Sequence, residues 1–245
     1  VCGLKDGDAR ACDRNVAFDI RSYKRLKMFV HAESTVQTGQ EMVKDGDVTL
    51  FMRLGTDFTD NYYEYEIPLK MSQWYDQSSG NVWPDANNID ILFDSLIAVK
   101  QRRNNLVSAG AAYMNELYSE EDNTTAGRLI KVIGNPNLQG LKIVMVGIRN
   151  PHKDGDNPFK PDDGRDKCLE VWINELRLTD FDQHGGWAAL ARMNANLADF
   201  GNVAISGNYS TPYWGSIEKR VSERQRETIV GWDGTSSFEL GKFFP

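Results

Sequence analysis

Alternating apolar and polar residues run through much of the chain and predict β-strands. In residues 23–34, for example, Leu26, Met28 and Val30 would share one face of a strand. The same period of two recurs in five more segments: 47–58, 61–69, 128–134, 141–150 and 167–178. Short turn-forming segments separate several of these strands. The pattern therefore predicts an antiparallel sheet.

A single helix is predicted among these strands, over residues 88–105. Pro84 and the Asp and Asn residues that follow it provide start signals. Apolar residues then recur at helical spacing: Ile89, Leu92, Phe93, Leu96 and Ile97. Six or seven antiparallel strands with one helix are typical of two packed sheets. We therefore predict an all-β fold with one helix: a leading loop over 1–14 and an antiparallel, jelly-roll-like β-sandwich over 15–184.

The last part of the chain, residues 185–245, has a different pattern. One face of the first strand carries Trp187, Ala189, Ala191, Met193, Ala195 and Leu197, and the other carries Leu190, Arg192, Asn194 and Asn196. The next strand sets Val203, Ile205, Gly207 and Tyr209 against Ala204, Ser206, Asn208 and Ser210. Such strands are typical of outer-membrane β-barrels, apolar toward lipid and polar toward the lumen. A soluble hairpin with one buried face is the alternative. Either interpretation predicts a long hairpin over 187–213, and a further strand is predicted to begin at Thr235.

Charge and hydropathy exclude two classes of protein. The 245 residues carry a net charge of -7, so the basic surface that nucleic acid requires is missing. No stretch reaches the roughly 18 to 20 apolar residues of a membrane helix. The excess of acid lies wholly before Trp187, with 29 acidic against 22 basic residues, which supports a boundary near Gly185. Because the chain begins without an initiator Met, we expect an internal piece of a longer protein.

Two groups of carboxylates are candidates for chemistry. Glu64 and Glu66 project from one face of a strand, as the acid and nucleophile of a retaining glycosidase do, although exposed Glu residues on a half-buried strand share this pattern. The loop 152–166 holds Asp154, Asp156, Asp162, Asp163 and Asp166. Carboxylates are the ligands that Ca²⁺ prefers, so this loop is a candidate structural calcium site. A solvated acidic turn is the alternative, and no other cofactor is expected.

The three cysteines and the loop tryptophans leave further alternatives open. Cys2 and Cys12 bracket a short loop and are the pair that could form a disulfide, with Cys168 as a buried thiol. Trp74 and Trp83 lie in predicted loops. If they cluster on one surface, they would favour a carbohydrate- or peptide-binding module at the cell surface.

Four segments carry a resemblance to a known family. They are RLGTDFTDNYYEYEIPL (53–69), NVWPDANN (81–88), RLIKVIGNPNLQGLKIVMVGIRNP (128–151) and the stretch from CLEVWINELRL to SERQRE (168–227). They resemble the SprA (Sov) family of Bacteroidetes, most specifically over 172–202.

The resemblance implies a fragment of a giant outer-membrane β-barrel channel that conducts folded proteins in type IX secretion and supports gliding motility. It implies an outer-membrane or cell-surface location and no catalytic residues. The implied partners are secreted protein substrates, other secretion-system subunits and, through the C-terminal strands, outer-membrane lipid.

Overall fold

The computed structural model describes residues 1–16, 20, 22–35, 41–153, 159, 163–181, 185–219, 224–225 and 227–243. The chain divides into two compact units, Val1–Phe181 and Asp182–Pro245. All the strand pairs within the described residues are antiparallel, so the expected all-β, antiparallel fold is confirmed.

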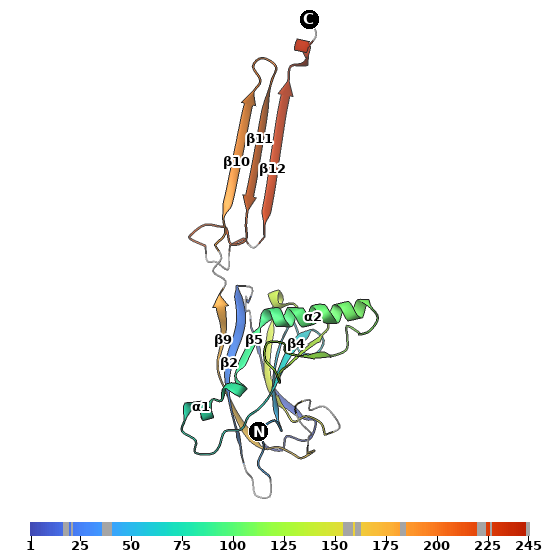
Figure 1. Cartoon of the computed structure of the whole chain (residues 1–245), viewed down its shortest axis with the longest axis vertical. Coiled ribbons are helices and arrows are strands. Elements are labelled where there is room, and N and C mark those ends of the chain that lie inside the picture. The colour runs from blue at the N-terminus through green and yellow to red at the C-terminus, as the bar shows by residue number, and fades with distance from the viewer. Residues whose placement is uncertain are drawn as a thin grey trace. The chain divides into compact units, whose positions relative to one another are not determined.

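The first unit is a sandwich of two unequal sheets (Figure 1). The larger sheet has the order β1-β8-β3-β4-β7-β6 and the smaller has the order β5-β2-β9. The strands are β1 (Ala9–Asn15), β2 (Tyr23–Ser34), β3 (Thr49–Gly55), β4 (Tyr62–Pro68), β5 (Ile89–Leu92), β6 (Tyr118–Glu121), β7 (Leu129–Ile133), β8 (Ile143–Arg149) and β9 (Leu169–Phe181). The helices are α1 (Ser79–Val82) and α2 (Phe93–Ser108), with short 3-10 turns at Asp85–Asn87 and Leu138–Gly140.

The core lies between the two sheets and follows the predicted alternation. Leu26, Met28 and Val30 of β2 are all at most 2% exposed. They belong to the same buried cluster as Met52 of β3 and Tyr65 of β4. Burying an aliphatic side chain of this size contributes about 1.5–3 kcal/mol. The period-two pattern therefore identified the residues that hold the sandwich together.

The predicted helix over 88–105 begins too early. Residues Ile89–Leu92 form strand β5, which pairs with β2, and α2 spans Phe93–Ser108. Ile89 and Ile91 alternate into the core from β5, and both are buried. Ile89 and Leu92 are three residues apart, which also fits a helix. The pairing with β2 decides for a strand, because it provides hydrogen-bond partners for the extended backbone of this segment.

The predicted leading loop over 1–14 contains a strand instead. β1 pairs with β8 in unbroken register from Ala9 to Asn15, and all its side chains are exposed. An exposed edge strand needs no apolar alternation, so the sequence pattern gave no signal for it. The edge strand β6 gives no signal for another reason: it has only four residues, and Tyr118 is its one apolar side chain.

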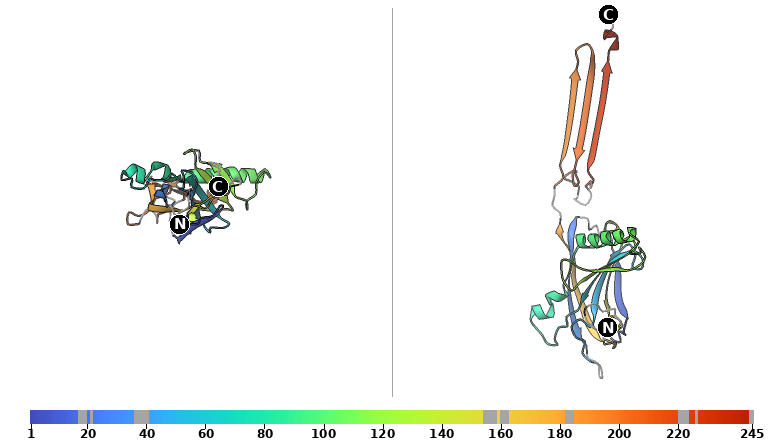
Figure 2. Two further views of the ribbon diagram at one scale, coloured as in Figure 1. Left: turned by 90° about the horizontal axis from the view of Figure 1, so that it is seen from below. Right: turned by 45° about the vertical axis from the view of Figure 1, so that its right-hand side comes forward.

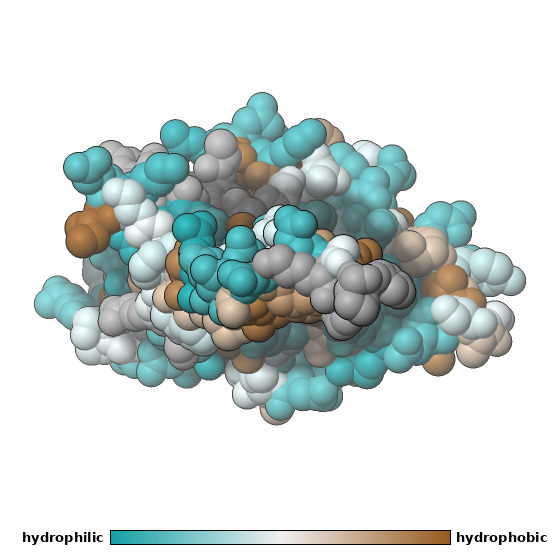
Figure 3. Space-filling model, turned by 90° about the horizontal axis from the view of Figure 1, so that it is seen from above, coloured by the Kyte–Doolittle hydropathy of each residue, from teal (hydrophilic) through white to brown (hydrophobic). Residues whose placement is uncertain are grey.

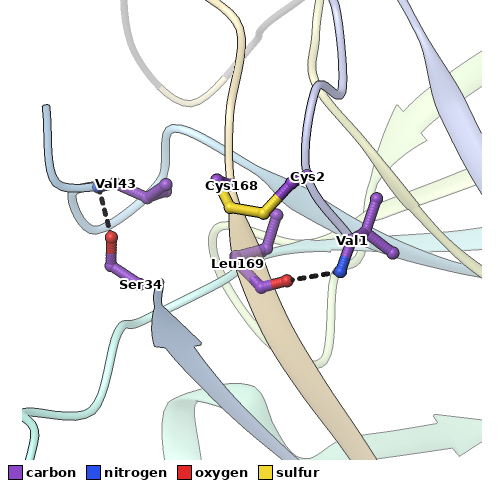
Figure 4. Close-up of a disulfide and its surroundings, with 6 residues drawn as sticks. All are labelled: Val1, Cys2, Ser34, Val43, Cys168 and Leu169. Atoms are coloured by element: carbon purple, nitrogen blue, oxygen red, sulfur yellow. Dashed lines mark hydrogen bonds between the residues drawn. A yellow bond between two sulfur atoms is a disulfide. The ribbon is translucent and has the colours of Figure 1, made fainter. Parts of the chain in front are cut away.

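The candidate Cys2–Cys12 disulfide, one of the alternatives that the sequence left open, does not form. Cys2 forms a disulfide with Cys168 (Figure 4). Cys12 is an exposed free thiol on β1. Leu4 forms a β-bridge with Lys167, and the amino group of Val1 donates a hydrogen bond of 2.8 Å to the carbonyl oxygen of Leu169. These contacts bring the N-terminus beside the start of β9. Only the tertiary structure places these two distant cysteines together.

The second unit holds a three-stranded sheet with the order β10-β11-β12. Its strands are β10 (Ala188–Asn196), β11 (Gly201–Ser210) and β12 (Ile229–Phe238), which lie side by side in one layer (Figure 2). The predicted hairpin over 187–213 is confirmed as β10 and β11. The next strand was expected from Thr235, but β12 begins at Ile229, and Leu240–Phe243 is a 3-10 turn.

Candidate functional site

The sheet β10-β11-β12 has one apolar face that continues across all three strands. Ala191 of β10 pairs with Gly207 of β11, and Gly207 pairs with Trp232 of β12. The neighbouring rows on this face hold Ala189, Tyr209 and Val230, then Met193, Ile205 and Gly234. None of these side chains carries a charge. The register therefore aligns the apolar residues of three separate strands into one surface.

The opposite face of the sheet is mostly polar. Its central row is Arg192, Ser206 and Asp233, which line a shallow cavity of about 260 Å³. The flanking rows bring Asn194, Asn196 and Asn208 onto the same face, with Leu190 as an apolar exception. A row that places a cation and an anion on either side of a hydroxyl needs water or polar partners.

Large apolar side chains of this sheet are open to solvent within the described residues. Met193 is 57% exposed and Trp232 is 85% exposed. Figure 3 views the chain from above, and hydrophobic residues are open at the surface that it shows, beside hydrophilic ones. An uncovered apolar surface of this kind indicates an interaction with another protein or with lipid.

Aromatic pairs mark both ends of the sheet. The rings of Trp187 and Tyr209 are 5.0 Å apart at one end, and those of Phe200 and Phe238 are 5.4 Å apart at the other. Gly201 makes room for Phe238, because a Cβ at Gly201 would come within 2.9 Å of that ring. From Tyr209 to Gly201 the strand covers about 26 Å at ~3.3 Å per residue. Outer-membrane barrels have an apolar band of about 25 Å between two aromatic girdles.

Glu64 and Glu66 share one face of β4, as predicted, but they are not the exposed residues of the favoured alternative, because a cluster of charges covers them. Glu64 accepts hydrogen bonds from Arg53 Nε at 2.7 Å and from Arg149 at 3.0 Å, and Lys131 Nζ lies 3.2 Å from it. Glu66 pairs with Arg149 at 2.6 Å and with Lys131. Both carboxylates are buried beneath these cations, at no more than 2% exposed.

An aromatic ring completes this cluster. The guanidinium groups of Arg53 and Arg149 lie 5.3 and 4.7 Å from the centre of the Phe51 ring. Gly147 on β8 makes room for this ring, because a Cβ there would lie 2.5 Å from Phe51 Cζ. The period of two in residues 47–58 places Phe51 and Arg53 on the same face of β3. The sequence pattern does not indicate that Lys131 and Arg149 lie beside them, because these two residues come from β7 and β8.

The electrostatics of the cluster suit an anionic Glu64. Burial raises the pKa of Glu64, but the positive charges of Arg149, Lys131 and Arg53 outweigh it and lower the pKa below its usual value. A glycosidase acid needs a raised pKa instead. The cations around Glu64 and Glu66 come from β3, β7 and β8, so these ion pairs tie neighbouring strands together. Holding the sheet together is the role that this geometry supports.

The candidate calcium loop is only partly described. Asp154, Asp156 and Asp162 lie outside the described residues. Asp163 accepts a hydrogen bond of 2.6 Å from Lys167. Burial raises the pKa of Asp163, but Lys167 and the Arg165 backbone N–H outweigh it and lower the pKa below its usual value. Among the described residues, no group of three or more His, Cys, Asp and Glu side chains could hold a metal ion. Calcium binding by the loop stays a prediction.

The loop tryptophans have different surroundings. Trp74 is 65% exposed and packs edge-on against Tyr75, with ring centres 5.3 Å apart. Trp83 is partly buried and lies against His31 at 5.9 Å. Trp74 and Trp83 therefore contact different aromatic rings, and within the described residues no ring contact joins the two tryptophans.

Both units are built from antiparallel strands, so the chain is an all-β protein. The first unit contains a disulfide, and the sheet of the second unit has one apolar and one polar face. The chain belongs to the SprA N-terminal family, described as motility related/secretion protein, and the match covers residues 1–245. The resemblance found in the sequence is therefore confirmed, and the chain is a motility- and secretion-related protein of the cell envelope. No curated protein matches it. Neither helix in the described part of the chain is long and apolar enough to cross a membrane.

Proposed function

We propose that the chain is a non-enzymatic part of a giant outer-membrane β-barrel channel that conducts folded proteins in type IX secretion and supports gliding motility. The sheet β10-β11-β12 would be part of the barrel wall. Its apolar face would contact outer-membrane lipid, and its polar face would contact water, secreted proteins or other secretion-system subunits.

The observation that carries this proposal is the register of the sheet. A soluble sheet with one buried face would have its apolar surface covered by a second layer. Here the apolar face is uncovered in the described residues, uncharged and bounded by aromatic pairs at both ends. Its length between these pairs matches the apolar thickness that a barrel strand must cross.

The disulfide supports an envelope location independently. Disulfides persist in oxidising compartments such as the periplasm and the cell surface, and they are rare in the cytosol. Cys2 and Cys168 are joined across 166 residues, so the bond ties the first unit into a closed loop. A domain at the outer membrane or cell surface would keep this bond.

The test compares two arginine substitutions on the same strand of the full-length parent protein. Ala191 lies on the apolar face and Asn194 on the polar face, and both are exposed positions of β10. A charge on the lipid face near the middle of the bilayer costs ~2–4 kcal/mol, whereas substitutions facing the lumen cost little. We expect Ala191→Arg to reduce the amount of protein assembled in the outer membrane and to impair secretion and colony spreading.

Asn194→Arg is the matched control, because it adds the same side chain three residues away. We expect normal assembly for this variant. Equal tolerance of both substitutions would place the sheet in water and remove the main support for the barrel. Equal loss would show that the strand rejects arginine for a reason other than lipid.

A further inference from the structure

The sandwich has a groove between the last strands of its two sheets. In the described residues, β1 ends the large sheet and β9 ends the small one. Residues from both strands line a groove of about 640 Å³. Elsewhere α2 bridges the sheets, because it packs against β2 and β5 of the small sheet and β7 of the large one. The groove therefore lies at an edge of the sandwich beside β1 and β9, whereas α2 covers the sandwich where it packs against β2, β5 and β7.

The floor of the groove is apolar. Val144 and Val146 of β8 line it and are themselves only 4% and 8% exposed. From the opposite sheet, Leu176 of β9 reaches the groove and is 40% exposed. An occupant would therefore bury apolar surface contributed by both sheets.

A bulge in β9 places Leu176 there. Lys27 pairs with Arg177 and Phe29 pairs with Asn174, so β9 has one more residue than β2 between these pairs. Glu175, within the bulge, has a φ of 54°, which a non-glycine residue rarely adopts. Bulges redirect side chains and also protect a strand edge from further pairing.

β1 has no bulge and no proline, two features that can protect a strand edge. Its register with β8 is unbroken over seven residues. Within the described part of the chain, no strand pairs with its other edge, where backbone N–H and C=O groups recur in regular order, although the Ala9 carbonyl accepts a hydrogen bond from Arg10. Such an edge is the template for adding a strand.

Arg14 and Asp13 both line the groove. Arg14 lies on the same face of β1 as Cys12, opposite Val144 and Val146 of β8, and Asp13 alternates to the other face.

We propose that this groove binds an extended segment of a partner protein, which adds a strand to the free edge of β1. Its alternate side chains would contact Val146 and Leu176, and a carboxylate would lie opposite Arg14. Opposite charges on directly paired residues stabilise a strand pair, and this pairing defines the partner as an apolar segment with an acidic residue. The inference concerns the first unit alone and does not depend on a barrel.

The test uses the intact 245-residue chain and three short, fluorescently labelled peptides with blocked ends. The first is Thr-Glu-Thr-Val-Thr-Val-Thr, which places Glu opposite Arg14 in antiparallel register. The second has Lys in place of Glu. The third has the first sequence with alternate backbone nitrogens methylated, which removes the hydrogen-bond donors of one strand edge.

Fluorescence anisotropy should show saturable binding of the first peptide and affinities lower by about tenfold or more for the other two. Arg14→Glu should reverse the preference between the Glu and Lys peptides. Leu176→Asp should weaken binding, and amide exchange in residues 9–15 should slow when the peptide binds. Arg165→Glu is the matched control, because Arg165 is exposed and lies outside the groove. This variant should bind all three peptides with the same affinities as the parent chain.

The proposal is overturned by any of three results. These are no saturable binding, equal binding of the N-methylated peptide, or an unchanged preference in Arg14→Glu whose circular dichroism shows a native fold. Light scattering measures whether the chain is a monomer or a dimer. A dimer that Leu176→Asp converts to a monomer would show that a second copy of this chain, rather than a partner protein, occupies the groove.

Discussion

Replacing Glu64 by glutamine should destabilise the first unit more than any single surface ion pair can explain. The Glu64 side chain is fully buried and contacts Arg53, Lys131 and Arg149, which are only 13–23% exposed. The glutamine side chain would keep the shape of the glutamate but remove its charge, which leaves three cations close together with Glu66 alone. Breaking a buried ion pair by removing one partner costs about 3–5 kcal/mol. Partial exposure of the cations places the expected cost near the lower end, at about 3 kcal/mol.

The matched control makes the same chemical change in a more exposed ion pair. Glu120 lies 2.6 Å from Arg102, whose side chain is 41% exposed. Exposed pairs contribute about 0.2–1 kcal/mol, so Glu120→Gln should cost little. For a domain of this size, 1 kcal/mol corresponds to about 2–4 °C in Tm. Glu64→Gln should therefore lower Tm by about 6–12 °C at neutral pH, measured by circular dichroism or calorimetry.

The pH dependence gives a second check on the same reasoning. The surrounding cations outweigh the effect of burial and hold the pKa of Glu64 below its usual value in the folded chain. A carboxylate with a lowered folded pKa stabilises the fold above the unfolded pKa of about 4.3, and this contribution is lost as the pH falls through the folded pKa. The difference in Tm between the parent chain and Glu64→Gln should therefore shrink below a pH of about 4. A Tm loss equal to that of Glu120→Gln, or a difference that grows in acid, would refute the ion-pair account.

Three further outcomes are expected. Cys2→Ser should destabilise the first unit by about 2–4 kcal/mol, seen as a lower urea midpoint, whereas Cys12→Ser should match the parent chain under the same conditions. Calcium at millimolar concentration should raise Tm if it binds the loop 152–166, and an unchanged Tm would leave that loop as a solvated turn. The chain should release no sugar from polysaccharides; cleavage that Glu64→Gln abolished without unfolding the chain would replace the transport proposal with an enzyme.

The period-two pattern predicted most of the strands and the residues of the core. Leu26, Met28 and Val30 were placed on the inner face of one strand, and all three are buried. The same pattern failed for β1, which is wholly exposed, and for β5, whose four residues also fit a helix. Alternation reports burial on one face, so an edge strand that buries neither face gives no such signal.

The two-faced sheet of the second unit could also be predicted, because each of its strands has its own alternation. Ala191 and Arg192 had to lie on opposite faces whatever strand lay beside them. The register between strands was not encoded in the same way. Pairing with Gly207 and Trp232 decides that the apolar face is continuous, and this pairing is known only from the folded sheet.

The sequence by itself determined which residues face inward, because side chains alternate across a strand whatever its partner is. The tertiary structure decided which distant residues meet. It brought Cys2 to Cys168 and Arg149 to Glu64, pairs separated by 166 and 85 residues. The physical reason is that alternation is a local property of the backbone, whereas these contacts depend on strand order, register and the approach of the two sheets.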